Sequence, residues 1–299
     1  MMPIERDLRG YFGMTETNIV NTAQHEYWNT VGGPRWIGLG GVVERRNLVF
    51  NDLLLERSAV ALDERVLEIG CGTGATIIPL AEAVGPHGRV VGVDISEPML
   101  AGARQRVADS GLGNISLVQA DAQVHRLEAG GFDLIVSRFG VMFFADPAAA
   151  FSNLLPAARP GGRLCFVCWG PLEENRHWMI PYEVALRHLG PPAPTPPHTP
   201  GPLAFSDRDY VRSILERAGF AEIVIDRETP DIIGSTPEEE AEYACVMGPP
   251  ARLIEEKKPD QAVRAVIRQE MAEAFADYAR GGPMLLPSTV FLVTAQRPR

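Results

Sequence analysis

The stretch from Val66 to Gly74 constrains the fold more than any other part of the chain. It begins with the mostly apolar run Val-Leu-Glu-Ile and continues into a turn with a glycine at every second position. A run of this length suits a buried strand, and glycines let the backbone turn sharply and approach a ligand without a Cβ in the way. The segment therefore predicts a strand, a nucleotide-binding turn and a helix, in that order.

The glycines alone leave two kinds of nucleotide open. A dinucleotide is one, because Gly70, Gly72 and Ala75 fit the spacing G-x-G-x-x-G/A and Asp94 follows about 20 residues later. Glu68 favours the other, because a carboxylate that faces the ligand prefers a cation to a pyrophosphate. The carboxylate therefore favours a cationic nucleoside.

Two further acidic residues support this interpretation. Residues 89–95 and 115–121 read as strands, and they end near Asp94 and at Asp121 respectively. Asp94 can accept hydrogen bonds from both ribose hydroxyls. Carboxylates at the ends of three neighbouring strands suit an adenosine that carries a positive charge better than they suit a diphosphate.

On these motifs the chain resembles the class I S-adenosylmethionine-dependent methyltransferases, in particular the bacterial group related to ubiquinone/menaquinone C-methyltransferases. Residues 133–144 and the Arg-Pro-Gly-Gly-Arg-Leu turn at 159–164 match as well, so the resemblance covers almost the whole chain. It implies a Rossmann-like α/β fold: a seven-stranded, mostly parallel sheet with helices on both faces, an antiparallel last strand and a helical cap.

The resemblance also implies a binding mode for S-adenosyl-L-methionine. The turn from Glu68 to Gly74 would receive the methionine end, Asp94 the ribose and Asp121 the adenine amino group. The full set of predicted cofactor contacts is Tyr27, Trp36, Glu68, Gly70, Cys71, Gly72, Gly74, Asp94, Ile95, Met99, Asp121, Ala122 and Ser137.

The alternation of apolar and helical segments predicts the element order. Strands are expected near 65–69, 89–93, 115–119, 133–136, 163–169, 221–228 and 288–296, and helices near 74–84, 97–109, 147–158, 175–189, 207–218, 237–247 and 260–280. The predicted divisions are a helical lid (1–62), a cofactor-binding core (63–170), a substrate-cap insertion (171–206), and the rest of the core (207–299) with a helical insertion at 237–280. The prolines at 191–202 predict an extended loop.

The N-terminal segment carries aromatic residues in the pattern Tyr27-Trp28-Asn29 and Gly-x-x-Trp36. Their ring faces could cover the cationic end of the cofactor. They could equally anchor the lid on the core by apolar packing. The sequence leaves both interpretations open.

Composition limits which class of methyl acceptor and which cellular compartment are expected. A formal net charge of -10 and the lack of a basic stripe argue against nucleic acid, so a small-molecule methyl acceptor is expected. The four cysteines do not form a disulfide framework, and no run of about 18 apolar residues or basic-apolar leader is present, so a cytoplasmic protein without a membrane span is expected. A homodimer is left open.

Methyl transfer from a sulfonium needs alignment of the acceptor and exclusion of water, and in some cases a base. The predicted catalytic residues are His177, Tyr182 and His25. Arg138 could pair with a substrate carboxylate or support the turn after the fourth strand. No histidine and cysteine spacing predicts a metal site. A cofactor-binding module without activity and an NAD-dependent oxidoreductase remain as alternatives.

Overall fold

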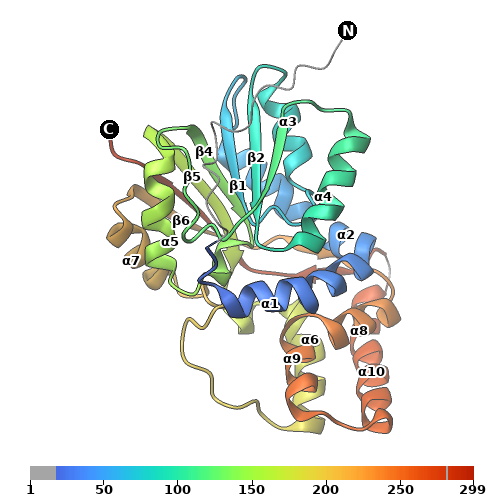
Figure 1. Ribbon diagram of the computed structural model, residues 1–299. Helices are drawn as coiled ribbons and strands as arrows, with labels where there is room; N and C mark the ends of the chain where they lie inside the picture. The colour runs from blue at the N-terminus through green and yellow to red at the C-terminus, as the bar shows by residue number, and fades with distance from the viewer. Residues whose placement is uncertain (1–17, 281) are drawn as a thin grey trace.

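The computed structural model describes residues 18–280 and 282–299, which form a sheet between layers of helices, with a further group of helices at one end of the sheet (Figure 1). Within these residues, seven strands make the large sheet, in the order β3-β2-β1-β4-β5-β9-β6. Neighbouring strands are parallel except for β9, which is antiparallel to both β5 and β6. The predicted Rossmann-like fold with an antiparallel last strand is confirmed. The strands are β1 (Arg65–Ile69), β2 (Arg89–Asp94), β3 (Ile115–Gln119), β4 (Phe132–Arg138), β5 (Ala158–Trp169), β6 (Ala221–Glu228) and β9 (Val290–Gln296).

Helices cover both faces of the sheet, with α2, α3 and α4 on one side and α5 and α7 on the other (Figure 1). Because both faces are covered, the central strands are apolar almost throughout and form the main core. Local signals set the helix starts: Asp146 and Asp207 accept N–H hydrogen bonds in the first turns of α5 and α7. The bounds are α2 (Gly32–Ser58), α3 (Ile77–Val84), α4 (Glu97–Ser110), α5 (Pro147–Leu154) and α7 (Arg208–Ala218).

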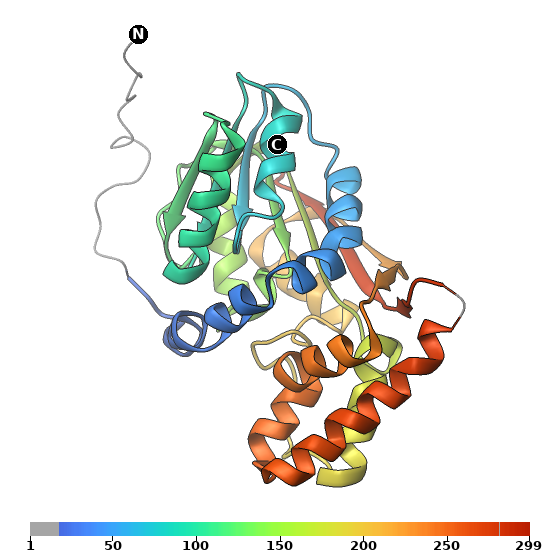
Figure 2. The ribbon, with the colours of Figure 1, turned by 90° about the vertical axis from the view of Figure 1, so that its right-hand side faces the viewer.

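Four helices form a cap at the carboxyl end of the parallel strands (Figure 2). They share a small apolar core of their own, which includes Val184, Leu253, Ile267 and Met271. They are α6 (Arg176–Leu189), α8 (Pro237–Val246), α9 (Gly248–Lys257) and α10 (Gln261–Ala276). Three of the four are predicted by the sequence, whereas α9 is not, because its start at Gly-Pro-Pro is typical of a helix break.

A long loop and a small two-stranded sheet accompany the four cap helices. Residues 190–202 form an extended loop between α6 and the core, as the prolines predict. The strands β7 (Asp231–Ile233) and β8 (Leu285–Pro287) pair antiparallel outside the main sheet, a pairing that the sequence does not predict. In the part of the chain that the structure describes, no helix combines the length and apolar character needed to cross a bilayer.

The N-terminal segment is helical, as predicted, although residues 1–17 of the proposed lid lie outside the described residues. Helix α1 (Thr22–Thr30) lies across the carboxyl edge of the sheet and leads into α2. Inside α2 the backbone departs from helical geometry at Gly40, with φ 38° and ψ -114°. A Cβ at Gly38, Gly40 or Gly41 would meet nothing within 4 Å, so these glycines serve the bend and not close packing.

Candidate cofactor and acceptor site

The glycine turn after β1 has the backbone shape that its sequence predicts. Gly70, Gly72 and Gly74 have φ of 69°, 55° and 80°, in the left-handed region that favours glycine. A Cβ at Gly70 would lie 2.8 Å from the Cα of Gly140, so the turn after β1 touches the turn after β4. At Gly72, a Cβ would meet only the end of the Met99 side chain, at 3.2 Å. The first glycine therefore serves the contact between turns, and the second leaves the backbone accessible to a ligand.

Asp94, the last residue of β2, is hydrogen-bonded to the backbone of the glycine turn. Its carboxylate accepts hydrogen bonds from Gly72 N at 2.7 Å and from Ser96 N at 2.9 Å, one on each oxygen. Burial raises the pKa of Asp94, and these backbone donors oppose the rise. Each carboxylate oxygen has a second lone pair, so Asp94 can still accept bonds from the two hydroxyls of a ribose.

Glu68 is a buried carboxylate without a hydrogen bond of good geometry. Its side chain is 1% exposed, and neither oxygen makes a hydrogen bond of good geometry with the described residues, although the Thr76 side chain lies near enough to influence it. Burial raises the pKa of Glu68 to about 7, although Thr76 and Arg138 oppose the rise. Because an unpaired buried carboxylate is unfavourable in any fold, its position beside the glycine turn indicates a site for a cationic ligand group.

Arg138, the last residue of β4, is the positive counterpart of Glu68. Its Nε and Nη1 atoms are buried without a hydrogen-bond partner in the described chain. Burial lowers the pKa of Arg138, and the carboxylates of Glu68 and Glu44 oppose the change. Glu44 is itself paired with the guanidinium of Arg106. Two unpaired groups of opposite charge therefore flank the turns after β1 and β4.

Asp121, expected to meet the adenine amino group, already has a full set of partners. It accepts hydrogen bonds from Val20 N at 3.0 Å, Asn21 N at 2.9 Å, Asn21 Nδ2 at 2.7 Å and Gln123 N at 3.0 Å. A carboxylate offers about four lone-pair positions. In this conformation Asp121 binds the start of the N-terminal segment. A contact with adenine would require one of these hydrogen bonds to break.

The lid contacts the turn after β2 through polar groups and the segment after β4 through an aromatic ring. Asn29 donates from Nδ2 to the Ile95 carbonyl and accepts from Glu97 N. The Trp28 ring packs edge-on against Phe143, with centroids 5.3 Å apart. The aromatic anchor is therefore Trp28, which was not among the predicted site residues although it stands in the same motif. Tyr27 is 39% exposed, and Trp36 lies edge-on to Trp28.

Several other predicted cofactor contacts face the protein. The Ser137 hydroxyl donates to the Ile69 carbonyl and accepts from Gly140 N, which favours a role in joining the two turns. The Cys71 side chain is buried against Gly92, where a Cβ would lie 2.9 Å from its sulfur. Ala122 is also buried, so these residues can offer a ligand little beyond their backbone.

The three predicted catalytic residues are not brought together. Tyr182 packs against the apolar core of the cap, where Glu256 and Arg252 influence its pKa. His25 lies on α1, in the lid. His177 is buried at the start of α6. These three side chains make no hydrogen bond or ring contact with one another in the part of the chain that the structure describes.

His177 lies between the cap and the sheet. Its ring packs against those of Trp169 and Trp178, at 5.0 and 4.7 Å between centroids, and neither ring nitrogen makes a hydrogen bond of good geometry. Burial lowers the pKa of His177 well below its usual value, Arg46 lowers it further, and the backbone of Pro287 opposes both. The imidazole is therefore neutral at pH 7.

A buried ion pair joins the cap to the core beside His177. Arg46 of α2 binds Glu240 of α8, and both side chains are almost fully buried, at 4% and 1% exposure. Glu240 also accepts from Ser235 N, and the Arg46 guanidinium lies 4.4 Å from the centroid of the Tyr243 ring. Because losing one member of such a pair leaves a buried charge without its partner, the pair fixes the cap on α2, the long helix of the N-terminal segment.

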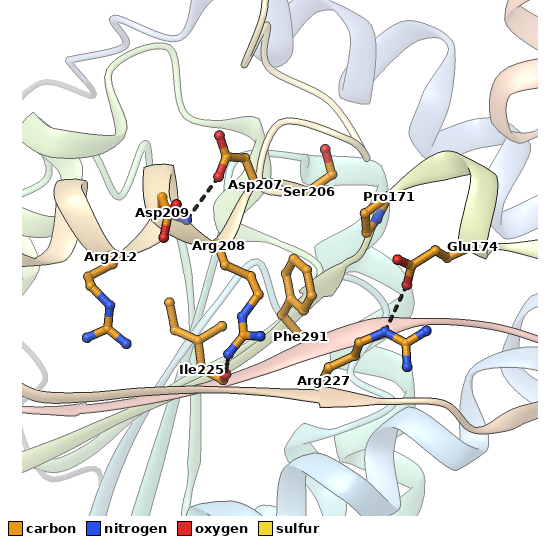
Figure 3. Close-up of a pocket in the computed structure, with 10 residues that line it drawn as sticks. All are labelled: Pro171, Glu174, Ser206, Asp207, Arg208, Asp209, Arg212, Ile225, Arg227 and Phe291. Atoms are coloured by element: carbon orange, nitrogen blue, oxygen red, sulfur yellow. Dashed lines mark hydrogen bonds and ion pairs between the residues drawn. The ribbon is translucent and has the colours of Figure 1, made fainter.

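An open groove of about 570 Å³ lies elsewhere, where α7 meets the sheet edge formed by β6 (Figure 3). Its arginines already have partners: Arg208 donates to the Ile225 carbonyl, Arg212 to the Ile223 carbonyl, and Arg227 binds Glu174. These side chains cover the edge strand, which protects it from pairing with another chain. None of the residues around the glycine turn lines this groove.

Comparison with known proteins agrees with the fold. Residues 66–162 match the family model of a methyltransferase domain. Nocamycin O-methyltransferase of Saccharothrix syringae is 29% identical over 272 residues, which cover 86% of this chain and 95% of that protein. The ubiquinone/menaquinone biosynthesis C-methyltransferase UbiE of Saccharophagus degradans is 38% identical over 117 residues, 39% of this chain and 47% of that protein.

Similarity to solved structures extends over most of the chain. Phosphoethanolamine N-methyltransferase 2 of Haemonchus contortus, solved with S-adenosyl-L-methionine, superposes with a TM-score of 0.51 at 20% identity, over 84% of this chain and 53% of that one. The chain thus spans about half the length of this protein and of UbiE, but nearly all of the nocamycin enzyme. In its sheet order, its glycine turn and the methyltransferase domain matched over residues 66–162, the chain is similar to the class I S-adenosylmethionine-dependent methyltransferases.

Proposed function

We propose that the protein transfers the methyl group of S-adenosyl-L-methionine to an oxygen, nitrogen or activated carbon atom of a small organic acceptor. The relatives named above support this class, because one is an O-methyltransferase and another a C-methyltransferase of quinone biosynthesis. The net charge of -10 supports an acceptor other than nucleic acid. The cysteines of the described chain are free thiols, which is consistent with a reducing compartment such as the cytoplasm.

One observation carries the cofactor assignment: Glu68 is a buried carboxylate without an ion pair or a hydrogen bond of good geometry among the described residues, and it lies beside a glycine turn whose Gly72 N–H is bound by Asp94. A cationic amino acid group would satisfy Glu68, and ribose hydroxyls would use the free lone pairs of Asp94. A dinucleotide would instead bring a pyrophosphate to the carboxylate of Glu68. The residues present therefore fit S-adenosylmethionine and not NAD.

The reaction is a displacement in which the acceptor's lone pair forms a bond to the methyl carbon while the carbon–sulfur bond breaks, leaving S-adenosylhomocysteine. The protein's task is to align the acceptor and keep water out. In this proposal α1 and the start of α2 close over the cofactor, and the cap of α6, α8, α9 and α10 covers the acceptor. The residues of the proposed lid and cap are 1–62, 171–206 and 237–280.

His177 is the predicted base that we retain. A neutral imidazole with an unpaired nitrogen can accept the proton of an acceptor hydroxyl, and burial keeps His177 neutral. Its position between Trp169 and the cap suits an acceptor held between the sheet and the cap. Tyr182 and His25 lie apart from it and are left without a catalytic role in this proposal.

Isothermal titration with S-adenosylmethionine, S-adenosylhomocysteine and NAD tests the cofactor assignment. Micromolar binding of the two sulfur nucleosides without NAD binding is expected. A methyl-transfer assay with labelled cofactor and a panel of phenols, enols, amines and carboxylic acids then tests the acceptor class. Binding of NAD in place of the sulfur nucleosides would refute the proposal.

A further inference from the structure

Arg138 has a buried positive charge for which the described chain provides no ion pair. Two of its three guanidinium nitrogens, Nε and Nη1, are buried and make no hydrogen bond. Burial lowers the pKa of Arg138, but a guanidinium group keeps its charge in proteins. An anionic partner from outside the chain would relieve the unpaired charge.

Strand register places Arg138 beside Glu68. Val136 of β4 pairs with Glu68 of β1, and residues two apart on a strand point to the same face. Arg138 therefore shares a face with Glu68, one strand away and one step nearer the carboxyl end. Their opposite charges influence each other's pKa, yet no ion pair forms between them, and neither Glu68 oxygen makes a hydrogen bond of good geometry with the described residues, although the Thr76 side chain lies near enough to lower the pKa of Glu68. The two groups are neighbours that do not satisfy one another.

The other cation in this region is already paired. Arg106 binds Glu44 through one terminal nitrogen and donates from Nε to the Thr73 carbonyl at 3.1 Å. Arg138 is thus left without an ion pair, and it stands two residues before Gly140, where the turn after β4 touches the glycine turn at Gly70. An anion bound there lies beside the nucleotide turn itself.

A neighbouring carboxylate and guanidinium that remain unpaired match a zwitterion with the opposite arrangement of charges. We infer that Arg138 binds the α-carboxylate of the cofactor's methionine moiety while Glu68 faces its α-ammonium group. The inference rests on the proposed function, because it names the residue that recognises one end of the proposed cofactor. A guanidinium binds a carboxylate through two parallel hydrogen bonds, which adds selectivity for this group over an uncharged end.

The test compares S-adenosylhomocysteine with its decarboxylated analogue, which keeps the adenosine, the thioether and the amino group. Affinities are measured by isothermal titration for the unmodified protein, Arg138→Met, Arg138→Lys and the matched control Arg45→Met, an exposed arginine on α2. We expect the unmodified protein and the control to prefer the carboxylate-bearing ligand roughly 10- to 100-fold, the effect of charge-assisted hydrogen bonds. Arg138→Met should lose this preference without binding the decarboxylated analogue less tightly, and Arg138→Lys should keep part of it.

The alternatives give different results. Equal weakening of both ligands in Arg138→Met would mean that Arg138 only supports the turn, and a preference that survives in Arg138→Met would mean that another group binds the carboxylate. Normal cofactor binding combined with a raised KM for an acidic acceptor would assign Arg138 to the acceptor. Each of these results overturns the inference while leaving the proposed function intact. No binding of S-adenosylhomocysteine to the unmodified protein would overturn both.

Discussion

Replacing Glu68 by glutamine should make the cofactor-free protein more stable at alkaline pH. Burial raises the pKa of Glu68 from 4.5 to about 7. At about 1.4 kcal/mol for each pH unit, the ionised side chain destabilises the folded state by about 3 kcal/mol above pH 7. Glutamine has nearly the same shape without the charge. Because its amide is also left without partners, we expect a stabilisation of about 1 to 3 kcal/mol at pH 8.

The pH dependence gives the sign of the effect. Between about pH 4.5 and 7 the folded protein holds a proton on Glu68 that the unfolded chain has already lost. The folded state binds more protons there, so the free energy of unfolding falls as the pH rises through this window and then levels off. The advantage of Glu68→Gln should therefore be close to zero at pH 4.5 and reach its full size near pH 8.

Urea unfolding at pH 5, 6, 7 and 8 measures this difference. Glu82→Gln, at an exposed glutamate on α3, is the matched control and should show no comparable trend. The same variant should bind S-adenosylmethionine more weakly, because the ammonium group loses its anionic partner. A stabilisation that is equal at all four pH values, or a loss of stability at pH 8, would refute the argument that Glu68 is an unpaired buried acid.

Three further changes test the other parts of the site. Asp94→Ala removes the acceptor for Gly72 N and for ribose, and should lower cofactor affinity roughly 10- to 100-fold by titration calorimetry; unchanged affinity would remove Asp94 from the site. Gly40→Ala places a Cβ on a backbone with φ 38° and ψ -114°, so it should straighten α2, displace the lid and speed proteolysis of the N-terminal segment; an unchanged cleavage rate would argue against the bend as the lid's attachment. His177→Phe keeps the aromatic packing and should lower turnover with unchanged cofactor affinity; normal turnover across a pH series would exclude it as the base.

The parts of the fold that the sequence predicts are those determined by local patterns. Each strand of the sheet is an apolar run bounded by turn residues, and the glycine turn follows directly from Gly70, Gly72 and Gly74. Helix α9 is not predicted by the same local patterns, because Pro249 and Pro250 suggest a helix break. Prolines are nevertheless tolerated in the first turn of a helix. The pairing of β7 with β8 is invisible for another reason: its strands have three residues each and come from distant parts of the chain.

The contacts that close the site are long-range and have no local signature. Asn21 meets Asp121 across 100 positions, and Arg46 meets Glu240 across 194. The sequence shows that Asp121 ends a strand, but it cannot show that the N-terminal segment returns to that end and occupies three of its four acceptor positions. The same is true of Ser137, whose hydroxyl joins two turns that become neighbours only in the folded sheet.

The number of hydrogen bonds that the protein donates to each carboxylate distinguishes acidic residues for which the sequence makes the same prediction. Glu68, Asp94 and Asp121 all stand at or near strand ends on the carboxyl edge, and position alone predicts a ligand contact for each. In the fold the protein supplies hydrogen-bond donors for all the acceptor positions of Asp121 and for about half of those of Asp94, whereas Glu68 makes no hydrogen bond of good geometry with the described residues. A group that the protein satisfies stabilises the fold without a ligand, whereas an unpaired buried charge lowers stability and persists where binding compensates for it. The number of hydrogen bonds that the protein supplies therefore predicts how much each carboxylate depends on the cofactor. Glu68 depends on it most and Asp94 less, whereas Asp121 can contact the cofactor only if it loses a hydrogen bond to the N-terminal segment. This difference also accounts for the opposite effects expected of Glu68→Gln, a gain in stability and a loss of cofactor affinity.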